Sequence, residues 1–241
     1  MFEREWILLN PGPANTSRSV REALVMPDLC HREPEFFEMM RECREQLVGL
    51  AGCAERFAAV LFTGSGTAAV EAAVCSAVPR DRGLLIVNNG VYGDRLARIA
   101  RVHGIPAEVL TYDVTTPVPP ADVEEALRAR PELTHVAVVH HETTTGLLNP
   151  VMDVARVAAR AGRRLLIDAM SSLFGERLQV DADGVDFVMA SANKCLQGAP
   201  GIAFVLGRRS ALNALAGQPP RSVYLDLHGH YVAQELSLIH I

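Results

Sequence analysis

Lys194 is the residue whose type and position best suit covalent chemistry. It follows the apolar run Phe187–Ala190 and precedes a turn rich in glycine and proline, Gly198–Gly201. A lysine amine attacks carbonyl groups when burial or neighbouring positive charge disfavours its protonated form. Because most lysines lie at the solvated surface, Lys194 alone is weak evidence, and its meaning depends on its neighbours in the fold.

Asp168 ends the apolar run Arg164–Asp168 and is the second candidate. In parallel sheets, ligands bind beyond the carboxyl ends of the strands, where Asp168 stands. A carboxylate buried without compensation is costly, so it needs a cationic or protonated partner. A pyridinium nitrogen is one such partner, and the carboxylate would keep the ring protonated as an electron sink. A helix-capping aspartate fits this segment equally well.

The segment Thr63–Thr67, which reads Thr-Gly-Ser-Gly-Thr, predicts an anion site between a strand and a helix. Free amides at a helix start, together with the helix dipole, favour a phosphate. The pattern differs from the dinucleotide fingerprint: it lacks a third glycine at the required spacing, and the next strand ends in Asn88-Asn89 instead of an acid. It also lacks the Gly-Lys-Ser/Thr of a nucleotide-triphosphate loop.

Alternating strands and helices must position these segments. Short runs that are apolar and rich in β-branched residues predict strands at Ala59–Thr63, Leu84–Asn88, Ala107–Tyr112, His135–His140, Arg164–Asp168, Phe187–Ala190 and Ile202–Leu206. Helical periodicity predicts helices at Ser17–Val25, Pro34–Leu50, Thr67–Val78, Tyr92–His103, Ala121–Arg130 and Val151–Ala161. The alternation predicts an α/β fold with a mainly parallel sheet. After Gly217–Pro220 the periodicity dissolves, and no helix is predicted there.

Composition and spacing exclude several classes of protein. A net charge of −5 without a basic cluster argues against nucleic acid as a partner, and the sequence offers neither a membrane span nor a signal peptide. Five irregularly spaced cysteines without a CxxC pair indicate a reduced, cytoplasmic chain. No metal site is predicted, because His140 and His141 lack further ligands at suitable spacing and His228 and His230 lie in the weakly patterned tail.

The ordered set Ser65-Gly66-Thr67, Asp168 and Ser191-Ala192-Asn193-Lys194 resembles class V aminotransferases. Within that class, His140–Gly146 and Ser191–Gly201 look most like 2-aminoethylphosphonate–pyruvate transaminases, and Leu9–Pro13 is similar to their N-terminal substrate-side segment. The resemblance implies the large domain of a fold type I transferase at residues 21–235, after a substrate-side segment at residues 1–20, with the small C-terminal domain missing. Residues 236–241 are expected to be a non-native tail.

The resemblance also implies a role for each site residue. Lys194 would bind pyridoxal 5'-phosphate covalently and then act as a base, while Asp168 would pair with the ring nitrogen. The expected cofactor-binding residues are Ser65, Gly66, Thr67 and Asn193 at the phosphate, Tyr92 and Met170 on the two ring faces, and Thr143 near the phenolic oxygen. Tyr92 fits ordinary core packing as well.

The implied reaction transfers the amino group of 2-aminoethylphosphonate to pyruvate in phosphonate catabolism, within a homodimer. Arg18 and Arg32 are candidates for the phosphonate, although solvated surface arginines fit them too. An alanine/serine–glyoxylate aminotransferase would share every cofactor residue, and without its small domain the chain could be an inactive cofactor-binding fragment. A cysteine desulfurase fits less well because no histidine precedes Lys194, and a nicotinamide dehydrogenase lacks its glycine pattern.

Overall fold

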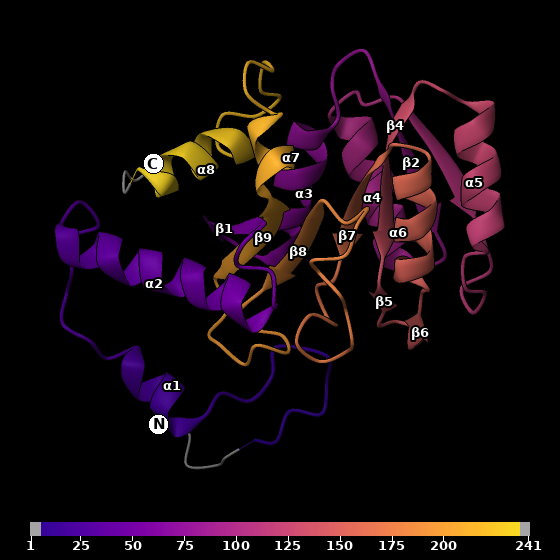
Figure 1. Cartoon of the computed structure of the whole chain (residues 1–241). Coiled ribbons are helices and arrows are strands. Elements are labelled where there is room, and N and C mark those ends of the chain that lie inside the picture. Colours follow the sequence, from indigo (N-terminus) through magenta and orange to yellow (C-terminus); the bar gives the residue numbers. More distant parts are fainter. Residues whose placement is uncertain (1–5, 237–241) are drawn as a thin grey trace.

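The computed structural model describes residues 6–236, which form a seven-stranded sheet covered by helices (Figure 1). In spatial order the strands are β1 (Phe57–Thr63), β9 (Ile202–Arg208), β8 (Phe187–Ser191), β7 (Arg164–Asp168), β4 (Leu133–Val139), β2 (Gly83–Asn88) and β3 (Ala107–Thr111). Neighbours from β8 to β3 pair in parallel, whereas β9 is antiparallel to both β1 and β8. The predicted mainly parallel α/β sheet is therefore confirmed.

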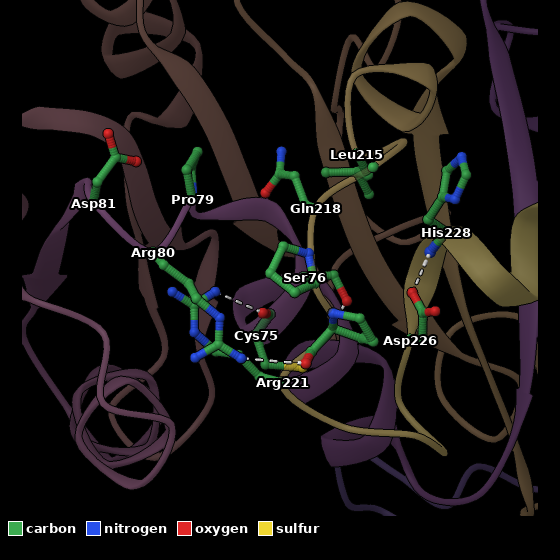
Figure 2. Close-up of a pocket in the computed structure, with 13 residues that line it drawn as sticks. Cys75, Ser76, Pro79, Arg80, Asp81, Leu215, Gln218, Arg221, Asp226 and His228 are labelled. Carbon is green, nitrogen blue, oxygen red and sulfur yellow. Dashed lines mark hydrogen bonds between the residues drawn. The ribbon is translucent and has the colours of Figure 1, made fainter.

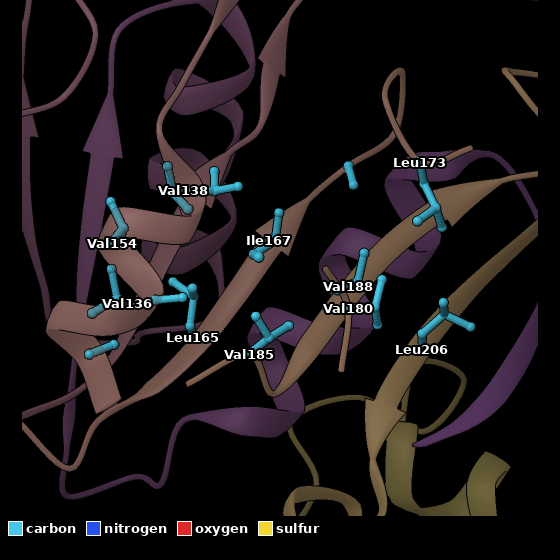
Figure 3. Packing of buried hydrophobic residues seen from close by; sticks show 14 of the residues in the cluster. Val136, Val138, Val154, Leu165, Ile167, Leu173, Val180, Val185, Val188 and Leu206 are labelled. Atoms are coloured by element: carbon cyan, nitrogen blue, oxygen red, sulfur yellow. The ribbon is translucent and has the colours of Figure 1, made fainter. Parts of the chain in front are cut away.

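The central strands are apolar throughout because both of their faces are buried. In β7, Leu165 and Ile167 join the core on one face, while Leu166 joins the core on the other. The first core, part of which is seen in Figure 3, is covered by α2 (Pro34–Leu50), α5 (Pro120–Ala129) and α6 (Val151–Arg160). The second is covered by α3 (Gly66–Ala77), α4 (Val91–Val102), α7 (Arg209–Asn213) and α8 (Leu227–Glu235). Helix α1 (Arg18–Ala23) has no buried residues.

Every predicted strand and helix is present, with ends that shift by no more than two residues. The short hairpin of β5 (His141–Glu142) and β6 (Leu147–Leu148) and the helices α7 and α8 were not predicted. The first five residues, and residues 237–241 of the predicted non-native tail, lie outside the described part. No helix in residues 6–236 is long and apolar enough to cross a membrane.

Helix α8 lies after Pro220, where the sequence shows no clear helical periodicity. Its start is capped by Asp226, whose carboxylate accepts a hydrogen bond from the His228 amide. The Gln234 side chain then pairs with the edge strand β1, accepting from Leu61 N–H at 2.9 Å and donating to Leu61 C=O at 2.8 Å. The helix thus depends on contacts with the sheet, which local periodicity does not reveal.

Candidate active site

A small cavity lies at the carboxyl ends of β4 and β7, beside the loop that follows β8. Its lining residues are Tyr92, Val139, His141, Thr143, Asp168, Met170, Ser171 and Lys194. The open space is about 10 Å³, roughly the room that one water needs. A larger ligand enters only when flexible side chains such as Lys194 and Met170 shift. The fold thus brings five of the predicted site residues to one cavity.

Asp168 presents a buried carboxyl group to this cavity. Its Oδ1 accepts a hydrogen bond from the Met170 amide at 3.0 Å. Burial raises the pKa of Asp168 to about 6, although the Met170 amide and the positive charge of Arg95 act in the opposite direction. A carboxyl group held in this way is stabilised as a carboxylate by a cationic or protonated partner in the cavity.

Lys194 lies beneath the N-terminal segment. Its Nζ donates a hydrogen bond to Gly12 C=O at 3.3 Å, and the Ala14 amide donates to Asn193 C=O at 3.0 Å. Gly12 has φ of +140°, and a Cβ at this position would collide with the Lys194 side chain. Glycine is required here for the close approach. The predicted substrate-side segment therefore contacts the predicted catalytic lysine directly.

Tyr92 reaches the cavity because it stands in the first turn of α4, whose start is held by Glu142. The Glu142 Oε2 accepts from the Tyr92 amide at 3.0 Å, and Oε1 accepts from the Thr144 hydroxyl at 2.6 Å. Glu142 is fully buried. The cap residue Gly90 has no side chain to do this, so a buried carboxylate satisfies the helix terminus. Glu142 lies in the motif His140–Gly146, in which no role was predicted for it.

The predicted anion loop lies beside the cavity without lining it. Ser65 is the N-cap of α3 and makes no side-chain capping bond. Gly66 packs so closely on Met170 that a Cβ would collide with its thioether. The Thr67 hydroxyl accepts from Arg95 Nη1 at 3.3 Å. Asn193, also predicted at the phosphate, accepts from the Ser191 hydroxyl at 3.0 Å and does not line the cavity.

Arg95 contacts two of the predicted site residues, Thr67 and Tyr92, but was not itself predicted to belong to the site. Besides Thr67, it lies over the Tyr92 ring, with Cζ 4.6 Å from the ring centroid. Arg18, one of the two predicted phosphonate ligands, pairs instead with Glu22 on α1, with its side chain 86% exposed. Arg32, the other candidate, is exposed as well. The sequence signal that could have indicated Arg95 is its position one helical turn after Tyr92.

The histidines are held by hydrogen bonds. His140 Nδ1 lies 2.9 Å from the Ser172 hydroxyl, and His141 Nδ1 lies 3.3 Å from the Ser171 hydroxyl. His230 in α8 is buried, with Nε2 2.8 Å from Tyr224 C=O. In the described residues, no group of three or more His, Cys, Asp or Glu side chains is placed to hold a metal ion.

A larger hollow, about 280 Å³, opens between the end of α3 and the segment that precedes α8 (Figure 2). Its arginines are already engaged with backbone carbonyls: Arg221 donates to Cys75 and Val78, and Arg80 donates to Pro220. These bonds tie the 215–221 segment to α3. Neither Lys194 nor Asp168 lines this hollow. The larger of the two cavities is therefore not the candidate active site.

Known proteins resemble this chain in sequence and fold. The family model described as Aminotransferase class-V matches residues 18–226. A 2-aminoethylphosphonate–pyruvate transaminase from Syntrophobacter fumaroxidans is 44% identical over 233 residues, which are 97% of this chain and 62% of that protein. One from Vibrio vulnificus is 42% identical over 98% of this chain and 64% of its own length. The chain thus spans under two thirds of these relatives.

Solved structures show the same fold. An alanine–glyoxylate aminotransferase from Nostoc sp. superposes with a TM-score of 0.89 at 27% identity, covering 100% of this chain and 65% of that one. An aspartate aminotransferase from Thermus thermophilus gives 0.86 at 29% identity, covering 97% and 65%. With a family model matched over most of its residues and this shared fold, the chain belongs to the class V aminotransferases.

Proposed function

We propose that this chain is the catalytic part of a transaminase that moves the amino group of 2-aminoethylphosphonate to pyruvate, giving phosphonoacetaldehyde and alanine. The observation that carries the proposal is a cavity lined by both Lys194 and the buried Asp168. The named activity of the relatives from Syntrophobacter and Vibrio supports this choice of substrates.

The site fits pyridoxal 5'-phosphate, the cofactor of class V aminotransferases. Asp168 is buried with a raised pKa and faces the cavity, which suits a protonated ring nitrogen. Lys194 is the only lysine of the sequence, and its amine would form the covalent bond to the cofactor. When bound, the cofactor supplies an electron sink for charge developing on the substrate carbon. Tyr92 and Met170 would flank the ring and Thr143 would lie near its phenolic oxygen.

Different residues of the chain would serve as the base, as the partner of the ring nitrogen and as the ligands of the phosphate. The Lys194 amine would act as the general base that takes the proton from the substrate carbon and would hold that proton for its return. Asp168 would pair with the protonated ring nitrogen and stay ionised there, because a nearby positive charge lowers the pKa that burial raises. Ser65, Gly66, Thr67 and Asn193 would hold the phosphate at the start of α3.

Product analysis tests the choice of substrates. The protein loaded with pyridoxal phosphate is mixed with 2-aminoethylphosphonate, alanine or serine, and each keto or aldehyde product is measured with pyruvate or glyoxylate as acceptor. We expect phosphonoacetaldehyde to form fastest, with pyruvate as the better acceptor. Faster reaction of alanine or serine with glyoxylate would contradict the proposal and favour the alanine/serine–glyoxylate alternative. Cofactor uptake without any product would identify a binding fragment.

We also infer that the enzyme is a cytoplasmic homodimer. Large apolar side chains near the N-terminus are exposed, among them Trp6, Ile7 and Leu9, the last at 94%. Exposed apolar side chains gathered in one short segment suit an interaction site. The five cysteines are free, as suits a reducing compartment. Sedimentation of the protein and of a variant with Ile7 and Leu9 changed to Ser tests the dimer, since a monomeric wild type would contradict it.

A further inference from the structure

Arg95 carries a positive charge that has no ion-pair partner in the described part of the chain, although it acts on the Asp168 carboxyl group. Within residues 6–236, its guanidinium makes one hydrogen bond, to the Thr67 hydroxyl at 3.3 Å, and no ion pair. Its side chain is half-buried against the Tyr92 ring, 4.6 Å from the centroid. A guanidinium presents several N–H donors in a planar fork that matches phosphate oxygens, and most of this fork is free.

The charges around the cavity require such a cation if a phosphorylated ligand binds there. Asp168 and Glu142 are both buried acids, so they oppose a further negative group. Lys194 cannot serve as the counter-charge of the phosphate, because its amine would be used in the covalent bond. Arg95 supplies a guanidinium beside this cavity, where it lies over the Tyr92 ring. It also contacts Thr67, at the start of α3, where the helix dipole favours an anion.

We propose that Arg95 and Thr67 together bind the phosphate of pyridoxal phosphate, with Arg95 as its fixed counter-charge. Stacking on Tyr92 would hold the guanidinium in place. Tyr92, which would flank the cofactor ring, would thus also position the arginine that binds the phosphate. The proposal rests on the proposed cofactor. A phosphonate substrate presents the same tetrahedral dianion, but the contact with Thr67 favours the cofactor as the source.

Equilibrium titrations with pyridoxal phosphate and with pyridoxal, which lacks the phosphate, test this assignment. Binding is followed by the absorbance of the lysine-bound aldehyde in the wild type, Arg95→Gln and Arg95→Lys. Arg98→Gln is the matched control, because Arg98 is an exposed arginine on the same helix. Circular dichroism and melting curves verify that each variant is folded.

We expect Arg95→Gln to weaken pyridoxal phosphate binding by about 10- to 100-fold while changing pyridoxal binding by less than about threefold. Arg95→Lys recovers part of the loss, since it keeps the charge but not the fork. Arg98→Gln binds both aldehydes as the wild type does.

Three results would overturn the assignment. Equal weakening of both aldehydes would mean that Arg95 acts only through the Tyr92 ring. Unchanged pyridoxal phosphate binding with a lost response to 2-aminoethylphosphonate would place Arg95 at the substrate instead. A wild type that binds neither aldehyde would reject the proposed function itself, an outcome that differs from a defect confined to Arg95→Gln.

Discussion

Strand β7 has a buried carboxyl group beside each end: Asp186 next to its first residue, Arg164, and Asp168 as its last. Asp186 has partners for both oxygens, accepting from the Leu165 amide at 3.0 Å and pairing with Arg164 at 3.2 Å. Asp168 accepts from the Met170 amide and, within the described residues, has no ion pair. Burial raises the pKa of both groups.

This is the difference that we expect between an acid that holds the chain and one that binds a ligand. A buried carboxyl group whose partners come from the protein is complete, and its role is to hold the chain. Asp168 instead faces a cavity that contains Lys194, so its missing partner is expected from a ligand. Perturbed acids in clefts are candidates for function, and the contrast with Asp186 gives a physical reason to choose Asp168.

Asp168→Asn is expected to have the largest effect on the reaction. An amide cannot hold the ring nitrogen protonated as a carboxylate does, so transamination should fall by about 10²- to 10³-fold. Single-turnover kinetics with 2-aminoethylphosphonate measures this loss, and Asp186→Asn is the matched control. A similar loss of activity in both variants would contradict the claim that Asp168, and not Asp186, takes part in the reaction.

The same variant should make the cofactor-free protein more stable at neutral and higher pH. Folding raises the pKa of Asp168 from 3.8 to about 6, so the folded state favours the protonated acid. The stability that this contributes is complete below pH ~4 and is lost as the pH rises through about 6. At pH 8, Asp168→Asn should therefore gain on the order of 2–3 kcal/mol in free energy of unfolding, and almost nothing at pH 4. Denaturant titrations at both pH values check this, and a loss of stability at pH 8 would contradict the unpaired state of Asp168.

Asp186→Ala should act in the opposite direction. Removing this side chain leaves the buried Leu165 amide without an acceptor and Arg164 without its partner, at a cost of about 1–3 kcal/mol of stability. Cofactor uptake should remain close to that of the wild type in conditions where the variant is folded. Selective loss of cofactor binding, with unchanged stability, would show that the two ends of β7 are not functionally distinct.

Glu142→Gln should have the smallest of these effects. Glutamine keeps one acceptor oxygen for the Tyr92 amide, and its NH2 group can donate to the Thr144 hydroxyl but cannot accept from the Thr144 amide, as Glu142 does. We expect a loss of about 0.5–2 kcal/mol in stability, as for a weakened helix cap, and a small shift in the absorbance of the bound cofactor. An unchanged spectrum and unchanged stability would show that Glu142 does not position Tyr92.

Sequence patterns located the parts of the site that follow strand ends. Lys194 and Asp168 could be singled out because they stand at or just after the carboxyl ends of buried strands, which meet at one edge of the sheet, whereas Thr143 was predicted from the family resemblance alone. Arg95 and Glu142 were missed, since the roles proposed for them depend on how a helix and a hairpin pack against each other; for Arg95 its place one turn after Tyr92 was the one available signal. Helix α8 was missed for a similar reason: its Gln234 is fixed by hydrogen bonds to the distant strand β1.

Identifying the amine that binds the cofactor tests the central claim most directly. Lys194 is the only lysine in the sequence, so the N-terminal amine is the one other primary amine available. The protein is incubated with pyridoxal phosphate, reduced with borohydride, digested and analysed by mass spectrometry, alongside Lys194→Ala. We predict one pyridoxyl phosphate adduct, on the peptide that contains Lys194, and none in the variant. An adduct confined to the N-terminal amine, or equal labelling of both proteins, would contradict the assignment of Lys194 as the catalytic lysine.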